Sequence, residues 1–441
     1  MSLSDRFRSL WPRRKPAARR SPVLASAQPA TTHPIEKRRA EEPASALPRF
    51  HTTAADHVDR ARLDPRSRER VRLRNSFTPT QPVSDPRMFA GRRDILVSLI
   101  RAVEDQRSHV VIYGDRGAGK TSLLRMLSRS ASEAKYIVAY FSCGATSDFN
   151  ETFRSVAQEI PLLYHSGVSP ISLNADVGSS LSDLLGSGKL TPRLFGDAAA
   201  KLVGTRVLVV LDEFDRAESA EFRRDVAELI KTLSDVSARL QLIIAGVAGD
   251  LVDLMEHIPS IRRNVTAVRV PAMQDAEVAN LVDNGSRMSG IKFDPAAVDL
   301  VVSAARGSPY LTNLLCHVAG ILALDAGRVR VEISDVSHAL EDVIEDFRRR
   351  LPHQLVVHLD KATDTFNAAE EATEATPAAK LERGASASPS AFNISAKVLE
   401  KLKKDGALQG ANPAAYALMI DSVTPYLQLR SARERFISQA A

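Results

Sequence analysis

The chain has 441 residues, which is too long for one ordinary domain and predicts two or three domains. Hydrophobic residues make up 44% and charged residues 25%, as in globular proteins generally, and no apolar run approaches the roughly 20 residues that cross a bilayer. We therefore expect no transmembrane segment and a cytoplasmic location. The two cysteines, Cys143 and Cys316, are far apart in apolar contexts, which argues against a disulfide framework or zinc site and favours reduced core side chains.

Charge is distributed unevenly along the chain. Residues 1–80 carry 18 Lys and Arg against 8 Asp and Glu, whereas the remainder carries 41 against 45. The first segment is rich in Pro, Ala, Ser and Thr, so we predict a disordered basic tail over residues 1–80, with a basic cluster at residues 62–74 that can form a short helix. Three interpretations remain open for this tail: a solvated linker, an arm for nucleic acid or an acidic partner, and a membrane-surface anchor through Phe7, Leu10 and Trp11.

From residue 81 to 273, β-rich runs alternate with helical patterns. Such alternation predicts an α/β domain, a parallel sheet with helices on both faces. The five expected strands are residues 109–113, 136–142, 206–211, 240–247 and 266–270. The third is apolar throughout, as in a strand covered on both faces. A helix is expected over residues 149–163, followed by a Gly- and Ser-rich loop insertion at 165–189 with a short helix near Leu181.

Residues 274–350 have helical periodicity and predict a lid domain of four helices, at residues 276–288, 295–305, 310–324 and 333–348. Residues 351–441 form the C-terminal domain. There a basic helix at 394–404 precedes two β-like runs, 416–420 and 426–429, joined by turn residues. A helix followed by a hairpin is the outline of a winged helix, and a plain helical cap with a hairpin fits the pattern as well.

A phosphate-binding motif follows the first expected strand and opens a helix, which is the context that a P-loop requires. Its glycines let backbone N–H groups close around phosphates, and the helix N-terminus adds partial positive charge. Lys120 can reach the β- and γ-phosphates, and the Thr121 hydroxyl can bind Mg²⁺. The motif is Gly114-Asp115-Arg116-Gly117-Ala118-Gly119-Lys120-Thr121, followed by Ser122.

Two carboxylates, Asp212 and Glu213, end the apolar third strand. In this position Asp212 would support Mg²⁺, directly or through water, and Glu213 would polarise the water that attacks the γ-phosphate of ATP. We interpret the nearby Asp215 as a surface residue. The two motifs together predict binding and hydrolysis of ATP with Mg²⁺.

With these motifs the chain resembles AAA+ ATPases, and more narrowly the clade that holds origin-recognition initiators, ExeA-like secretion ATPases and transposition ATPases. The resemblance covers roughly residues 88–350. Further matching segments are Phe89-Ala90-Gly91-Arg92 beside the adenine, residues 242–246 with Asp250-Leu251 at the sensor 1 strand, and Gly307-Ser308-Pro309-Tyr310 with Asn313 at the sensor 2 helix. The resemblance also implies that Arg262 or Arg263, just before the fifth strand, reaches the γ-phosphate of a neighbouring subunit, so a homo-oligomer is expected.

The chain departs from this family in two places. Gly246, Val247 and Ala248 supply no polar side chain at the sensor 1 position, and Tyr310 stands where the sensor 2 helix usually brings an arginine. Both losses predict slow turnover and a nucleotide-dependent switch. Arg306 is close enough in sequence to substitute, and is equally well explained as a surface charge.

Three functions remain open at this stage. The first is an ATPase whose nucleotide state switches or remodels a macromolecular partner, and the second is an ATP-dependent DNA-binding initiator or transposition-type regulator. The third is a membrane-surface scaffold ATPase for secretion or envelope assembly. The sequence identifies neither the protein or DNA partner nor the oligomeric state.

Overall fold

The computed structural model describes residues 65–83, 85–167, 179–247, 263–353, 355–360 and 413–440, all within the unit Thr52–Ala441. Five parallel strands form one sheet in the order β2-β3-β4-β1-β5. The strands are β1 (His109–Tyr113), β2 (Ile137–Ser142), β3 (Val207–Asp212), β4 (Leu240–Gly246) and β5 (Val265–Arg269). All five predicted strands and the parallel sheet are confirmed.

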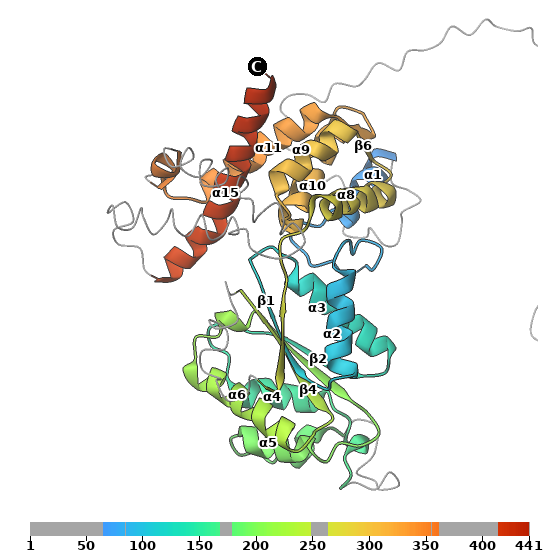
Figure 1. The fold of residues 1–441 in the computed structure, drawn as a ribbon, viewed down its shortest axis with the longest axis vertical. Helices are drawn as coiled ribbons and strands as arrows, with labels where there is room; N and C mark the ends of the chain where they lie inside the picture. The colour runs from blue at the N-terminus through green and yellow to red at the C-terminus, as the bar shows by residue number, and fades with distance from the viewer. Residues whose placement is uncertain are drawn as a thin grey trace, which may run out of the picture. The chain divides into compact units, whose positions relative to one another are not determined.

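Helices cover both faces of this sheet (Figure 1). One face carries α2 (Arg93–Glu104) and α3 (Lys120–Glu133), and the other carries α4 (Phe149–Gln158), α5 (Pro192–Ala199) and α6 (Ala220–Asp235). The side chains of β3 alternate between the two cores: Val209 packs with the aromatic residues of α4 to α6, and Leu208 and Val210 pack with α2 and α3. The wholly apolar strand is therefore buried on both faces.

The segment between β2 and β3 differs in detail from the prediction. The helix expected over residues 149–163 ends at Gln158, because the chain turns at Ile160 and Pro161 before the short helix η1 (Leu162–Tyr164). The short helix expected near Leu181 is present as η3 (Leu181–Leu184). Residues 168–178 of the predicted insertion lie outside the described residues.

The four predicted lid helices are present as α8 (Asp275–Ser289), α9 (Pro295–Ala305), α10 (Pro309–Asp325) and α11 (Ile333–Arg349). A two-stranded parallel pair, β6 (Lys292–Phe293) and β7 (Arg330–Val331), joins them. These helices share one hydrophobic core, separate from the two cores of the sheet.

The short helix expected within the basic cluster at residues 62–74 is present, so the prediction of a disordered tail over residues 1–80 is wrong for residues 65–80. Helix α1 (Pro65–Ser76) lies against α8 and α10 (Figure 1), and Leu73 and Phe77 are fully buried. Two glycines make room for them: a Cβ on Gly320 would lie 2.6 Å from Leu73, and one on Gly285 would lie 2.2 Å from the Phe77 ring. Two large side chains seated against glycines therefore order a helix that is otherwise mostly charged.

The predicted hairpin at residues 416–429 is also wrong. Residues 413–440 form a single helix, α15 (Pro413–Ala440), with Pro425 inside it. Val423, Tyr426 and Leu427 recur at helical spacing and are buried against α9 and α11, which favours the helix over a turn at Pro425. The wing of a winged helix is thus absent from residues 413–440, and the basic helix predicted at 394–404 lies outside the described residues.

Both cysteines are free and buried, as predicted. Burial raises the pKa of the Cys143 thiol to about 12, so the thiol stays protonated and inert. Within the part of the chain that the structure describes, no helix combines the length and apolarity needed to cross a bilayer.

Candidate functional site

The glycine-rich loop lies between the carboxyl end of β1 and the first turn of α3. Gly114 passes so close to the neighbouring chain that a Cβ would lie 2.4 Å from the Val270 carbonyl oxygen. Gly119 caps the N-terminus of α3, and its φ of 90° is a left-handed conformation that favours glycine. The loop therefore turns its backbone toward the N-terminus of a 14-residue helix, where backbone N–H groups lack intrahelical partners.

Lys120 is buried under this loop. Its Nζ donates hydrogen bonds to the carbonyl oxygens of Gly114, at 2.9 Å, and Asp115, at 2.8 Å. Burial lowers the pKa of the ammonium to about 8, although the nearby Asp215 and Asp212 carboxylates oppose this shift. The lysine is thus a desolvated cation held by carbonyl groups, ready to exchange them for an anionic ligand.

Asp212 is buried at the end of β3 and accepts two hydrogen bonds. Tyr140 Oη donates to Oδ2 at 2.6 Å, and the Glu213 backbone N–H donates to Oδ1 at 2.9 Å. The Arg125 guanidinium lies 3.8 Å from the centre of the Tyr140 ring and fixes that ring. Burial and then the hydrogen bond to Asp212 raise the pKa of Tyr140 well above its ordinary range, so the tyrosine remains a donor.

Glu213 follows β3 directly and has φ 53°, a left-handed backbone conformation. Its Oε2 accepts hydrogen bonds from Ser142 Oγ at 2.8 Å and from Arg216 Nη1 at 2.9 Å. Asp215, interpreted from the sequence as a surface residue, is instead half-buried, and its Oδ1 accepts a hydrogen bond from the Val247 backbone N–H at 2.8 Å. Asp215 thereby ties the turn after β3 to the end of β4.

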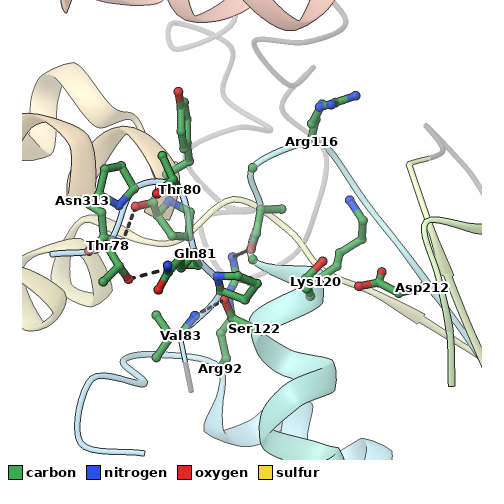
Figure 2. A pocket seen from close by; sticks show the side chains of 18 of the residues that line it. Thr78, Thr80, Gln81, Val83, Arg92, Arg116, Lys120, Ser122, Asp212 and Asn313 are labelled. Carbon is green, nitrogen blue, oxygen red and sulfur yellow. Dashed lines mark hydrogen bonds between the residues drawn. The ribbon is translucent and has the colours of Figure 1, made fainter. Parts of the chain in front are cut away.

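One pocket of about 380 Å³ brings these groups together. Figure 2 shows Lys120, Ser122 and Asp212 on one side of it and Thr78 and Asn313 on the other. Besides the loop and the carboxylates, lid residues from α8 and α10 line it. The lining residues from the two motifs are Arg116, Gly117, Ala118, Gly119, Lys120, Thr121, Ser122, Asp212 and Glu213, whereas Gly114 and Asp115 do not line it. From the segment expected beside the adenine, Phe89, Ala90 and Arg92 line it as well. Thr121 and Asp212 offer hard oxygen atoms in one pocket, which fits Mg²⁺.

The segment 78–83, which follows α1, forms a wall of this pocket. The Val83 backbone N–H donates to Ser122 Oγ at 3.1 Å, so the segment is attached to the first turn of α3. Arg92 is buried behind the loop, and its Nη2 donates to the carbonyl oxygens of Ala118, at 3.2 Å, and Pro271, at 2.5 Å. The guanidinium thus joins the loop to the chain that enters the lid.

The departures predicted at the two sensor positions are present in the structure. Val247 presents a backbone N–H, and no polar side chain, at the end of β4, and Tyr310 lines the pocket at the start of α10. Arg306 does not line it, but lines a neighbouring cavity of about 440 Å³ on the other side of residues 115–118. The residues Ala248, Asp250 and Leu251 lie outside the described residues.

Of the two arginines expected before β5, Arg262 lies outside the described residues and Arg263 is exposed in the turn that precedes the strand. The next residue, Asn264, accepts a hydrogen bond from the backbone N–H of His109, the first residue of β1. Arg263 therefore lies at the amino ends of the strands, whereas the glycine-rich loop and Asp212 lie at the carboxyl ends. The structure does not bring it to the chain's own pocket.

A glycine-rich loop between a parallel strand inside the sheet and a helix, with an acidic pair at the carboxyl end of another strand of the same sheet, defines a P-loop NTPase. The model of the family "Novel STAND NTPase 1" matches residues 80–325. The chain belongs to this family.

Individual proteins are also similar to the chain. An ORC1-type DNA replication protein of Thermoplasma volcanium is 25% identical over 266 residues, which are 57% of this chain and 58% of the relative, so the chain spans little more than half of that relative. Among solved structures, the ORC2 protein of Aeropyrum pernix has TM-score 0.45 and 17% identity, covering 83% of this chain and 98% of its own. Cdc6p of Pyrobaculum aerophilum has TM-score 0.45 and 13% identity, covering 82% and 98%. The predicted resemblance to AAA+ ATPases of the origin-recognition clade is confirmed by the family and the sequence relative.

Several residues of the site were missed by the reasoning from sequence. Tyr140 and Ser142 hold the two carboxylates because β2 pairs with β3 in a register that places Ser142 opposite Asp212. The only advance signal was the presence of two polar side chains two residues apart at the end of a strand. The wall formed by residues 78–83 had no signal at all, because that stretch looked like the end of a tail.

Proposed function

We propose that this protein binds ATP with Mg²⁺ and hydrolyses it slowly, and that the nucleotide state switches its lid and thereby a macromolecular partner. The observation that carries this proposal is the composition of one pocket. It is lined by the P-loop and both carboxylates of the sheet domain and also by Leu281, Pro309 and Asn313 of the lid. We take residues 81–273 as the sheet domain and residues 274–350, with residues 65–80, as the lid. A nucleotide in this pocket would contact both domains.

Each residue has a role in this proposal. The glycine-rich loop, Gly114 to Ser122, would surround the phosphates with backbone N–H groups, and Lys120 would release its two carbonyl partners to bind phosphate oxygens. Thr121 and Asp212 would hold Mg²⁺, which neutralises charge on the phosphates when bound. Glu213 would orient the attacking water. Its present hydrogen bonds to Ser142 and Arg216 must loosen for this, which is a further reason to expect slow turnover.

The sensor 2 helix α10 brings no arginine into the pocket, and Arg216, which lines it, is paired with Glu213, so we propose that a second copy of the chain supplies a cation for the γ-phosphate. We assign this role to Arg262 or Arg263, since arginine binds phosphate oxygens through a planar, permanently charged group. Arg263 lies at the amino ends of the strands, opposite the pocket at their carboxyl ends, which supports action on a neighbouring subunit.

Substitution of the P-loop lysine tests the nucleotide site. Lys120→Ala should abolish measurable binding of a labelled ATP analogue while the thermal unfolding midpoint stays close to that of the wild type. Lys231→Ala, at an exposed position on α6, is the matched control and should bind normally. Equal binding of the analogue by the Lys120→Ala protein would refute the site.

A second candidate function is ATP-dependent DNA binding. The relative from Thermoplasma volcanium is called a DNA replication protein, and α1, which follows the basic N-terminal segment in the sequence, carries the exposed residues Arg68, Arg72 and Arg74. Fluorescence anisotropy with duplex DNA, with and without ATP, tests this. Each phosphate contact that a truncation removes should flatten the slope of log K against log salt by about 0.9. Absence of binding at low salt would leave a protein partner as the object of the switch.

A further inference from the structure

The cavity of about 440 Å³ beside the glycine-rich loop is distinct from the pocket assigned to ATP. Four segments that are far apart in the chain line it: residues 115–118 of the loop, residues between 306 and 311 at the start of α10, the end of α11, and residues of α15 between 422 and 428. Its volume lies in the range of small-molecule sites. The cavity is therefore large enough for a ligand of its own.

The charged side chains that line this cavity are mostly basic. Arg116 comes from the glycine-rich loop, Arg306 follows α9, and Arg350 ends α11. Asp115 supplies the one carboxylate among the described residues of the lining. Three guanidinium groups with one carboxylate leave an excess of positive charge, which favours an anionic ligand.

The types of donor in the lining suit a phosphate group. The three arginines belong to three separate elements, and a phosphate can bind several guanidinium groups at once through its oxygen atoms, each by two parallel hydrogen bonds. The hydroxyl-bearing residues Ser308 and Ser422 also line the cavity and can donate further hydrogen bonds. The lining therefore favours a phosphate-bearing small molecule over one that carries a single carboxylate.

This cavity and the nucleotide pocket share part of their walls. Arg116, Gly117, Ala118 and Tyr310 line both spaces. Figure 2 shows the Arg116 side chain directed away from Ser122, which lies deeper in the nucleotide pocket. An anion that binds Arg116 from the second cavity would add negative charge directly beside the loop that is proposed to hold the phosphates of a nucleotide.

We propose that this cavity is a second anion site, which binds a phosphate-bearing small molecule through Arg116, Arg306 and Arg350 and speeds the release of nucleotide from the P-loop. The site itself depends on the cavity alone, and its effect on release rests on the proposed function. Release is faster because two anions on opposite sides of residues 116–118 repel each other and compete for one guanidinium group. By linkage, a bound nucleotide weakens the second anion by the same factor in affinity.

Calorimetry with pyrophosphate tests the site itself. The full-length Lys120→Ala protein, whose P-loop is disabled, should bind pyrophosphate saturably at constant ionic strength. Arg306→Gln or Arg350→Gln in that background should weaken this binding about tenfold, because each removes a charged hydrogen-bond donor. Arg349→Gln is the matched control: Arg349 is also exposed and also pairs with the acid four residues before it, but does not line the cavity. Absence of saturable binding, or binding that the Arg306 and Arg350 variants leave unchanged, overturns the site.

Release of a labelled nucleotide tests the coupling. The wild-type protein is loaded with ADP that carries a fluorescent methylanthraniloyl group, and excess unlabelled ADP prevents rebinding. A ligand that only competes for the P-loop cannot change the dissociation rate under these conditions. Pyrophosphate, with free Mg²⁺ held constant, should therefore speed release about fivefold or more through the second cavity.

The same variants assign this acceleration to the cavity. The Arg350→Gln protein should lose it, and the Arg349→Gln protein should keep it. Unchanged or slower release in the wild type, or full acceleration in the Arg350→Gln protein, overturns the coupling. Failure of the wild type to bind labelled ADP at all would instead refute the proposed function, and the calorimetric result would then decide the second site alone.

Discussion

Lys120 is the residue whose ionisation bears most directly on nucleotide binding. Its pKa of about 8 lies below the ordinary 10.5, so the ligand-free protein loses this positive charge as the pH rises through 8. Affinity for ATP should therefore be constant up to about pH 7 and fall by up to tenfold per pH unit above 8, since one proton must be taken up on binding. Titration of a labelled ATP analogue from pH 6.5 to 9.5 measures this. Constant affinity over that whole range would contradict a depressed pKa.

Glu213 allows binding and hydrolysis to be separated. Glu213→Gln keeps an oxygen for Ser142 and nearly the same volume, but removes the charge that polarises water. ATP binding should stay within about twofold, while phosphate release slows by about 10²–10⁴-fold. Glu218→Gln, an exposed position after the same turn, is the matched control. Unchanged turnover in the Glu213→Gln protein would show that the Glu213 carboxylate is not catalytic.

The sequence predicts site residues that belong to a continuous motif, and does not predict those that reach the site through contacts between segments far apart in the chain. The P-loop and Asp212-Glu213 are continuous segments whose shape is set by their own residues. Each follows a strand of one parallel sheet, so the motifs predict that both lie in one site. Tyr140 and Ser142 contact the site only because β2 pairs with β3 in one register, which no local pattern encodes. The interpretation of Asp215 as a surface residue is wrong for the same reason, because its partner Val247 follows another strand, β4.

Helix α1 is the element whose role is most open to a stability measurement. Phe77→Ala removes a ring that is fully buried against Gly285, and should lower the free energy of unfolding by about 3–5 kcal/mol. Chemical denaturation measures the loss, with Val97→Ala, at a partly exposed position on α2, as a control expected to cost far less. A change of less than about 1 kcal/mol would mean that α1 is not seated as described.

The elements predicted correctly are those with strong periodicity over a long segment, such as β3 and the four lid helices. The two errors at this scale, α1 and α15, have a common cause. Among its described side chains α1 buries only two apolar ones, Val71 and Leu73, with Phe77 directly after it, and in α15 short apolar runs flank Pro425, so local composition indicated a tail with a short basic helix, and a hairpin. In both cases packing against the lid decides the structure, and the lid surface cannot be read from the segment itself.

At the scale of the whole molecule, we expect hydrolysis to depend on contact between copies. Arg262 and Arg263 would complete the pocket of a neighbour, so specific activity should rise with protein concentration. An arginine finger contributes about 10³–10⁵ in rate. The Glu213→Gln protein keeps its arginines, and the Arg262→Ala/Arg263→Ala protein keeps its carboxylate, so mixing the two should restore activity that neither has alone. No recovery on mixing, together with flat specific activity in the wild type, excludes the finger.

The parallel sheet has a consequence for the form of any such assembly. All five strands run in one direction, so the two ends of the strands are unlike. The carboxyl ends carry the P-loop and Asp212, and Arg263 lies at the amino ends. Two antiparallel copies related by a two-fold axis would complete each other's pockets, whereas copies that point the same way would join head to tail in a series with a polarity. An open head-to-tail series ends in one copy whose pocket has no neighbour, so it has one fewer completed pocket than it has copies. Only a closed assembly, a two-fold pair or a ring, would complete every pocket, and activity per copy would then stop rising with length.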